Sequence, residues 1–343
     1  MITEKDYKPL FVDKIYGDLL VCGNKRNLKE NDLEIVIDVI KRCNYKCDYC
    51  TTSHSMYKAK DDYELDLTDL VIPMVKSKVF NGIFNKNKTH NKITFFITGG
   101  EPTLYKKLES ILKLLETVYN ADEIILVTNG SKSVKFYLDL LDKFKTLTIR
   151  CSYHAKFANN QHFYDLINLK NDKFIFLILM DEIYKDKIIN FIENIKYDKQ
   201  CIYRALVNHF YTDEDIIKYI NKHNNILNYE HNTEYKNCFM QFEKKTIELN
   251  RNSLNLLRTY DHLNIFKDMY CDIIRQCWSI SASSLHMCEV GHYDLRYEMD
   301  RFDEDYIKYY KNGFKCNADY CKFFGISDVV RHKDKSFKYE YDD

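Results

Sequence analysis

Strand-like and helix-like segments alternate through residues 33–210, and this alternation restricts the chain to a small set of folds. Such an order of elements indicates a parallel sheet covered by helices. The predicted strands are Glu34–Ile40, Lys92–Thr98, Glu123–Thr128, Thr146–Cys151, Phe174–Leu179 and Ile202–Val207. The predicted helices are Leu67–Lys78, Tyr105–Tyr119, Val134–Phe144, Gln161–Leu169 and Ile183–Ile195.

Two of the predicted helices have features that can be checked directly. Pro73 lies inside the first helix, which it should kink or shorten because proline lacks the backbone N–H. In the second helix the apolar residues recur at helical spacing and should face the sheet. These residues are Leu108, Ile111, Leu112, Leu115 and Val118.

Three cysteines follow the first predicted strand within eight residues, at Cys43, Cys47 and Cys50. A structural zinc site takes four protein ligands, whereas three leave one position open for a reactant. A four-iron cluster usually has four thiolates, so three would leave one iron free to bind a small molecule. The residues alone leave open the alternative of half a zinc site completed by distant cysteines.

Glycine is rare in this chain, with nine residues in 343, so the adjacent pair Gly99–Gly100 after the second predicted strand needs a backbone reason. Glu101 and Pro102 follow it, and Pro102 is one of only three prolines. Glycine adopts positive φ and lets the main chain approach a ligand closely. We therefore expect a ligand-binding turn here, with a plain strand-to-helix turn as the alternative.

The Cys-x3-Cys-x2-Cys loop and the segment Thr98–Thr103 together resemble the radical S-adenosylmethionine (radical SAM) superfamily. This resemblance implies a partial (β/α)6 TIM-like barrel, with a 4Fe-4S cluster held by Cys43, Cys47 and Cys50. It also implies that SAM binds the open iron and that the Gly-Gly-Glu segment, including Gly99, Gly100, Glu101 and Pro102, meets the methionine amino group.

Polar or small residues recur where predicted strands end, which is where chemistry collects in α/β barrels. The resemblance places Asn129, Ser152 and Val207 near SAM, and Tyr49 beside its adenine. His154 also follows the fourth strand. A lone histidine is a weak signal, so we expect an exposed loop residue there, with a substrate-facing proton carrier as the alternative.

Length and charge limit the remaining possibilities. With 343 residues, about two domains are expected. Lys+Arg and Asp+Glu both number 51, and this neutral balance argues against a dedicated nucleic-acid partner. The sequence shows no signal-peptide core and no apolar run near 18 residues, so we expect a cytoplasmic protein without a membrane partner. Its twelve cysteines are then metal ligands or free thiols.

The chain divides into a lead-in (1–32), the barrel (33–210) and a smaller cysteine-rich α+β extension (211–343). The lead-in has one short predicted strand near Asp18–Val21, and residues 210–267 are expected to be mainly helical or irregular. Single cysteines are usually small buried hydrophobes. We interpret Cys22, Cys151, Cys201 and Cys238 in this way.

The extension contains two further pairs of cysteines. Cys277 and Cys288 flank a predicted hairpin, while Cys316 and Cys321 form a close second pair. Four thiolates suffice for a second 4Fe-4S cluster or a structural zinc, with Cys271 as a substitute ligand and ordinary buried thiols as the alternative. The tail is similar to the twitch and SPASM extensions of radical SAM enzymes, although the usual glycine between the first two cysteines is missing.

The resemblance implies an enzyme that reductively cleaves SAM to a 5′-deoxyadenosyl radical, which abstracts a hydrogen atom from a peptide or small-molecule substrate. It implies an electron donor such as flavodoxin or ferredoxin. No catalytic side chain is identified from the sequence. Two alternatives remain: a radical SAM enzyme that modifies tRNA or a nucleotide, and a non-catalytic zinc or iron–sulfur protein.

Overall fold

A computed structural model describes residues 32–47, 63–84, 92–180, 182–195, 201–206, 238–242, 245–249, 270–271, 277–287, 291–312, 314–315 and 331–332. The predicted strand near Asp18–Val21 lies outside these residues, as do the third cysteine of the loop and most of the extension. None of the helices among the described residues has the length and apolar character needed to span a bilayer.

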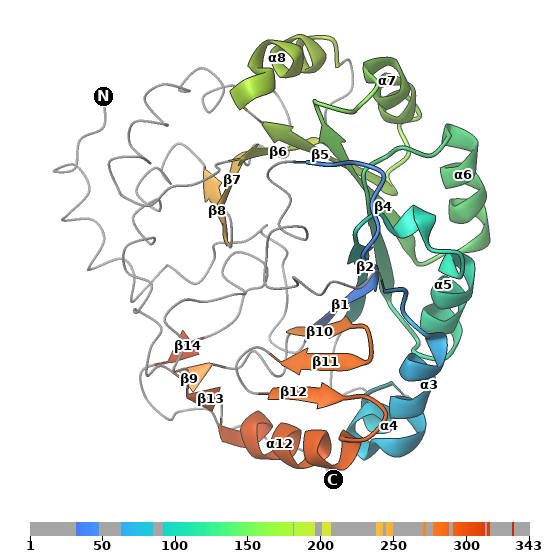
Figure 1. The fold of residues 1–343 in the computed structure, drawn as a ribbon, viewed down its shortest axis with the longest axis vertical. Coiled ribbons are helices and arrows are strands. Elements are labelled where there is room, and N and C mark those ends of the chain that lie inside the picture. The colour runs from blue at the N-terminus through green and yellow to red at the C-terminus, as the bar shows by residue number, and fades with distance from the viewer. Residues whose placement is uncertain are drawn as a thin grey trace, which may run out of the picture.

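The described strands form two sheets, and the larger one contains all six strands expected from the alternation (Figure 1). Its order is β12-β11-β10-β1-β2-β3-β4-β5-β6-β7-β8, with β10, β1 to β6 and β7 running parallel. The six expected strands are β1 (Asp32–Ile40), β2 (Lys92–Gly99), β3 (Glu123–Thr128), β4 (Leu147–His154), β5 (Phe174–Met180) and β6 (Cys201–Leu206).

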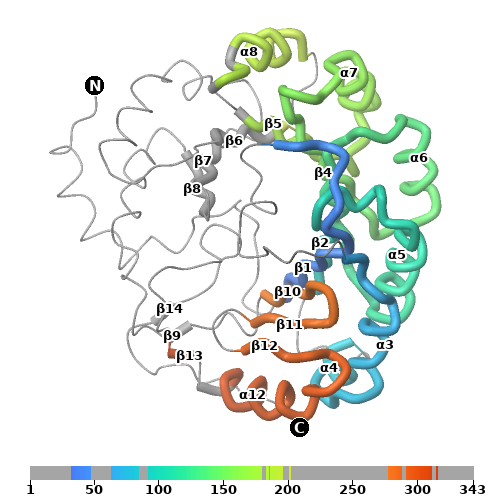
Figure 2. Tube along the Cα trace, viewed as in Figure 1, coloured from blue at the N-terminus to red at the C-terminus, as the bar shows by residue number. Residues whose placement is uncertain are grey.

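Helices connect the parallel strands and lie along the outer side of the arc that the strands form (Figures 1 and 2). They are α3 (Leu67–Lys76), α4 (Lys78–Phe84), α5 (Leu108–Thr117), α6 (Val134–Lys143), α7 (Asn160–Asn168) and α8 (Lys185–Glu193), with short 3-10 turns at Pro102–Leu104 and Glu182–Tyr184. This mixed α/β fold with parallel strands is consistent with the partial barrel that the sequence predicts.

Local sequence determines where these helices begin and end. The side chain of Asp66 accepts a hydrogen bond from the backbone N–H of Thr68 and so caps the start of α3. The helix ends at Lys76, three residues after Pro73, and α4 starts again at Lys78. The predicted shortening at this proline is therefore confirmed.

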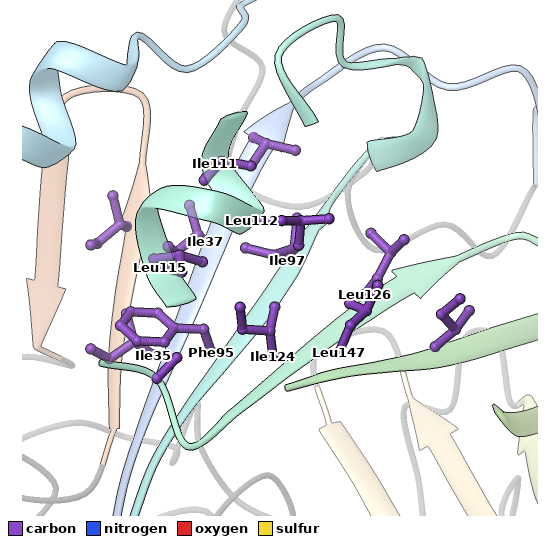
Figure 3. Close-up of a cluster of buried hydrophobic side chains, with 14 of the residues drawn as sticks. Ile35, Ile37, Phe95, Ile97, Ile111, Leu112, Leu115, Ile124, Leu126 and Leu147 are labelled. Atoms are coloured by element: carbon purple, nitrogen blue, oxygen red, sulfur yellow. The ribbon is translucent and has the colours of Figure 1, made fainter. Parts of the chain in front are cut away.

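The hydrophobic core lies between the sheet and its helices. Figure 3 shows side chains of α5 packed on those of β1, β2 and β3. The prediction for the apolar face of α5 is confirmed for Leu108, Ile111, Leu112 and Leu115, all of which are buried. It is wrong for Val118, which is 40% exposed, because the helix ends at Thr117 and Val118 caps it.

A C-terminal segment completes the other side of β1. Strand β10 (Cys277–Ser281) runs parallel to β1 and forms an antiparallel hairpin with β11 (Ser284–Met287), followed by β12 (Gly291–Asp294). The predicted hairpin is therefore confirmed. Trp278 of β10 is fully buried against Phe80 of α4 and Phe302 of α12 (Met299–Asn312).

Two strands lie in the segment 210–267, which was expected to be mainly helical or irregular, and the rest of that segment lies outside the described residues. Strands β7 (Cys238–Phe242) and β8 (Lys245–Leu249) extend the sheet beyond β6, and β7 pairs parallel to it. A smaller sheet joins β13 (Phe314–Lys315), β9 (Tyr270–Cys271) and β14 (Arg331–His332). The chain after residue 210 thus adds strands to both edges of the barrel sheet, and the division into domains stays a prediction.

Candidate active site

The carboxyl ends of β1 to β4 meet around the cysteine loop. Among its residues the structure describes Cys43, which is exposed, and Cys47, which is partly buried. The backbone N–H of Tyr45 donates to Sγ of Cys43 at 3.3 Å. Cys50 and Tyr49 lie outside the described residues.

The Gly-Gly-Glu segment after β2 packs on the start of this loop. The backbone N–H of Gly100 donates to the carbonyl oxygen of Ile40 at 2.6 Å, and that of Glu101 donates to the carbonyl oxygen of Arg42 at 2.8 Å. Gly99 has φ +128, and a Cβ on Gly100 would overlap the carbonyl oxygen of Arg42. The main chain that approaches these glycines belongs to the root of the cysteine loop, and the predicted ligand contact of Gly99 and Gly100 stays a prediction.

Glu101 connects the ends of β2 and β3 through a buried carboxylate, since its residue is only 1% exposed. Its Oε1 accepts from the backbone N–H of Thr103 at 3.1 Å, and from the hydroxyls of Thr103 and Thr128 at 2.6 Å each. Its Oε2 accepts from the backbone N–H of Asn129 at 2.7 Å. The predicted role of this carboxylate, as partner of the SAM ammonium, stays a prediction.

Asn129 extends this network onto the cysteine loop. Its Nδ2 donates to Oδ1 of Asn44 at 2.7 Å and lies 3.9 Å from Sγ of Cys43. The Nδ2 of Asn44 in turn donates to the hydroxyl of Ser131 at 3.0 Å. The structure thus brings the predicted residue Asn129 to the loop, together with Asn44, which sequence reasoning did not single out.

The turn after Asn129 depends on Gly130. This residue has φ +72, a left-handed conformation that favours glycine. A Cβ there would also lie 2.7 Å from Cζ of Phe163 in α7. On the other side of the turn, Nε2 of His162 lies 2.8 Å from the carbonyl oxygen of Gly130. Helix α7 therefore fixes the turn that carries Asn129.

The end of β4 contacts the later part of the cysteine loop. Nδ1 of His154 lies 3.4 Å from Sγ of Cys47. The ring of Tyr45 stacks on that of Phe157 with centroids 4.8 Å apart, and meets the ring of His154 edge-on at 5.8 Å. The expectation of an exposed loop residue at position 154 is wrong, because His154 is the last residue of β4 and is partly buried. Burial lowers the pKa of His154 to about 4.

Alternation along β4 explains which of its residues lie on the same face as His154. Cys151 and Tyr153 are fully buried, and Tyr153 stacks on Phe191 of α8, whereas Ser152 and His154 point to the opposite face. The interpretation of Cys151 as a buried hydrophobe is confirmed, as it is for Cys201. The same period of two, applied to the predicted residue Ser152, would have placed His154 on the site face.

The proposed auxiliary cysteines are only partly described. Cys277 is 0% exposed at the start of β10, opposite Glu34 near the amino end of β1. The cysteine loop follows the other end of β1, so Cys277 and Cys43 lie at opposite ends of these parallel strands. Cys288, Cys316 and Cys321 lie outside the described residues, as does the predicted adenine contact Val207, and nothing is described of the side chain of Cys271 in β9.

The described donor set fits an iron–sulfur cluster. Thiolates are the ligands that iron–sulfur clusters take, and Cys43 has an N–H donor at its sulfur, as cluster sulfurs commonly have. Within the described residues no three Cys, His, Asp or Glu side chains are grouped for a metal ion. The predicted set includes a third thiolate, Cys50, beyond these residues.

A loop of cysteines at the carboxyl ends of parallel strands, held there by glycines and buried polar residues, defines an α/β protein built around a thiolate site. The family model described as the radical SAM superfamily matches residues 37–223, more than half of the chain. The chain therefore belongs to the radical SAM superfamily. The cofactors of this family are a 4Fe-4S cluster and SAM.

Curated relatives match over part of their length. A protein of Methanocaldococcus jannaschii, provisionally named as a glycyl-radical enzyme activating enzyme, is 29% identical over 180 residues, which are 51% of this chain and 58% of the relative. The GTP 3′,8-cyclase of Helicobacter pylori is 33% identical over 106 residues, covering 31% of this chain and 30% of the relative. The chain thus spans less than two thirds of both relatives.

Two solved structures are also similar. BtrN in complex with AdoMet and 2-DOIA has 14% sequence identity and a TM-score of 0.41, with 90% of this chain and 97% of that chain covered. SuiB of Streptococcus suis bound to the precursor peptide SuiA has 14% identity and a TM-score of 0.42, with 88% and 65% covered. Both scores are low, and the family assignment rests on the family model.

Proposed function

We propose that this protein reductively cleaves SAM at a 4Fe-4S cluster held by Cys43, Cys47 and Cys50. When bound, the cluster would supply one electron to SAM, whose sulfonium C–S bond would break to give methionine and a 5′-deoxyadenosyl radical able to abstract a hydrogen atom from a peptide or small-molecule substrate. The observation that best supports this proposal is the convergence of three strand ends on the cysteine loop, through Gly100, Asn129 and His154.

The residues of the chain would position the thiolates and the substrate. Gly100 and Glu101 hold the root of the loop by backbone hydrogen bonds, while Asn129 and His154 contact the two described cysteines. We further propose a set of SAM contacts, of which Tyr49 and Val207 lie outside the described residues. The full set is Tyr49, Gly99, Gly100, Glu101, Pro102, Asn129, Ser152 and Val207.

Two further parts of the proposal concern the extension and the electron source. Cys277, Cys288, Cys316 and Cys321 would form one auxiliary site, holding a second 4Fe-4S cluster or a zinc ion, with the four thiolates that such a site needs. A flavodoxin or ferredoxin would supply the electron. The auxiliary site would either accept the electron left after hydrogen removal or help to bind the substrate.

The decisive experiment measures 5′-deoxyadenosine from SAM after anaerobic reconstitution with iron and sulfide. Cys43→Ala should abolish product formation, because it removes one of only three anchors for the cluster. Cys201→Ala is the matched control, since this thiol is buried in β6 within the core. Normal 5′-deoxyadenosine yield from Cys43→Ala would refute the proposal.

A nucleotide substrate is the second candidate. Several relatives that share 28–34% identity with this chain are named GTP 3′,8-cyclase. Addition of GTP, of a tRNA mixture or of synthetic peptides to the reconstituted protein distinguishes the candidates. The substrate class that is consumed together with SAM is the correct one. Nucleic-acid binding should in addition weaken steeply with salt.

A further inference from the structure

The sulfur atoms of both described cysteines of the loop lie near nitrogen atoms. The sulfur of Cys43 lies 3.3 Å from the backbone nitrogen of Tyr45 and 3.9 Å from Nδ2 of Asn129. The sulfur of Cys47 lies 3.4 Å from Nδ1 of a side chain, that of His154. A side-chain neighbour can be replaced without changing the backbone, so its contribution can be measured.

The imidazole ring of His154 is held in this orientation from several sides. Its residue ends β4, and its carbonyl oxygen accepts from the backbone N–H groups of Phe157 and Ala158 at 2.9 and 2.8 Å. Tyr45 meets the imidazole edge-on and stacks on Phe157. Because Tyr45 belongs to the cysteine loop, this aromatic group fixes the loop and the histidine relative to each other.

We propose that His154 donates a hydrogen bond from Nδ1–H to the thiolate of Cys47 and thereby raises the reduction potential of the cluster that Cys47 binds. A ligating thiolate has no proton, so the hydrogen between these two atoms comes from the imidazole. A donor at a cluster sulfur stabilises the more negative, reduced state, and hydrogen bonds to the sulfurs are among the factors that set cluster potentials. His154 is thus a positioning residue.

The inference rests on the proposed function, because it takes Cys47 as a cluster ligand. Two other roles for His154 predict different behaviour. As an iron ligand it would contribute to iron loading. As a proton carrier to the substrate it would leave the potential unchanged on replacement.

The experiment uses the full chain with His154→Asn and His154→Phe. The amide nitrogen of asparagine occupies nearly the position of Nδ1 and retains an N–H donor, whereas phenylalanine retains the ring and lacks the donor. His292→Asn, on the exposed part of β12, is the control. The cluster potential is measured by anaerobic spectroelectrochemical titration without SAM, alongside iron content.

For His154→Phe we expect the ratio of reduced to oxidised cluster at a fixed potential to fall about tenfold, which is about 59 mV for a one-electron couple. His154→Asn and His292→Asn should stay close to wild type, with equal iron content in all four proteins. An unchanged potential in His154→Phe would overturn the inference. So would a shift of equal size in His154→Asn, or a loss of iron in either variant at position 154.

A second measurement needs no cluster. In the apoprotein, alkylation by iodoacetamide is followed separately at Cys43 and Cys47 by peptide mass spectrometry. His154→Phe should slow alkylation several-fold at Cys47 and leave Cys43 unchanged, because a donor favours the reactive thiolate. Equal rates at Cys47 in wild type and variant would overturn the inference. Failure of the wild type to bind a cluster would instead refute the proposed function, while this rate still tests the contact.

Discussion

The carboxylate of Glu101 accepts a hydrogen bond from the backbone N–H of Asn129 at 2.7 Å, and the side chain of Asn129 reaches Cys43 of the cysteine loop. Three consecutive strand ends are therefore linked by this acidic side chain and its neighbours. The glutamate of the Gly-Gly-Glu segment has a structural function in this chain, whatever else it contacts.

Glu101→Gln should destabilise the protein by about 1–3 kcal/mol, because an amide nitrogen would face donors in a buried site. Urea unfolding of the apoprotein measures this. Glu109→Gln is the control, since Glu109 forms an exposed ion pair with Lys143 and should change stability by less than about 1 kcal/mol. Equal stability of the two variants would show that the buried network contributes nothing.

Gly100→Ala should reduce both stability and iron loading. The new Cβ would overlap the carbonyl oxygen of Arg42, so the root of the cysteine loop must move. Gly82→Ala in α4 is the matched control, because open space surrounds its Cβ position, and it should stabilise the helix by about 0.8–1.0 kcal/mol. Thermal unfolding and iron analysis check both variants. Full iron content in Gly100→Ala would contradict the expected displacement of the loop.

Asp38 should make stability depend on pH between about 4 and 6. Burial raises the pKa of this carboxyl from 3.8 to about 6, so with rising pH the unfolded state loses the proton first and wild-type stability falls. The side chain of Asp38→Asn does not titrate in this range. The free energy of unfolding of the variant, relative to that of wild type, should therefore rise through this window and level off above pH 6, by about 1–3 kcal/mol in total. Urea titrations at pH 4, 5, 6 and 7 test this. A difference that is constant with pH would exclude the effect.

Replacement of Cys43, Cys47 and Cys50 together should leave metal in the protein, if the auxiliary site exists. The expected content is about four irons, or one zinc. Chelation should then affect the C-terminal segment before the barrel, because thiolate ligation stabilises the structure around it. Metal-free triple variants would show that the cysteines of the extension are ordinary thiols.

Local pattern determines much of this fold. Strand β3 has the predicted ends Glu123–Thr128, and the other five expected strands agree to within a few residues, because apolar runs between amphipathic helices are a local signal. Pairing across long stretches of chain is not local. Strands β7 and β8 lie in a segment that looked helical or irregular, and helix α12 was not anticipated.

In the candidate site, too, local features were predictable from the sequence and contacts between distant segments were not. The motif residues Cys43 and Gly100 were found from their spacing after predicted strands, and Asn129 was added by the resemblance to the radical SAM superfamily. The residues that hold them could not be found in this way, because hydrogen bonds between loops, such as that from Asn129 to Asn44, depend on how separate strand ends meet. The position of His154 could have been predicted, because the period of two along β4 places it on the same face as Ser152. Its contact with Cys47 could not, because that contact depends on where the cysteine loop lies.

The pairing of β10 with β1 has a consequence for synthesis of the chain. Residues 277–281 supply one neighbour of β1, and Trp278 fills the space between α4 and α12. Translation at about 5–20 residues per second leaves that edge of β1 without this partner for tens of seconds after β1 emerges from the ribosome. Unpaired edges are templates for aggregation. We therefore expect a nascent barrel that ends near residue 210 to aggregate more readily than the full chain, in which β10 pairs with β1.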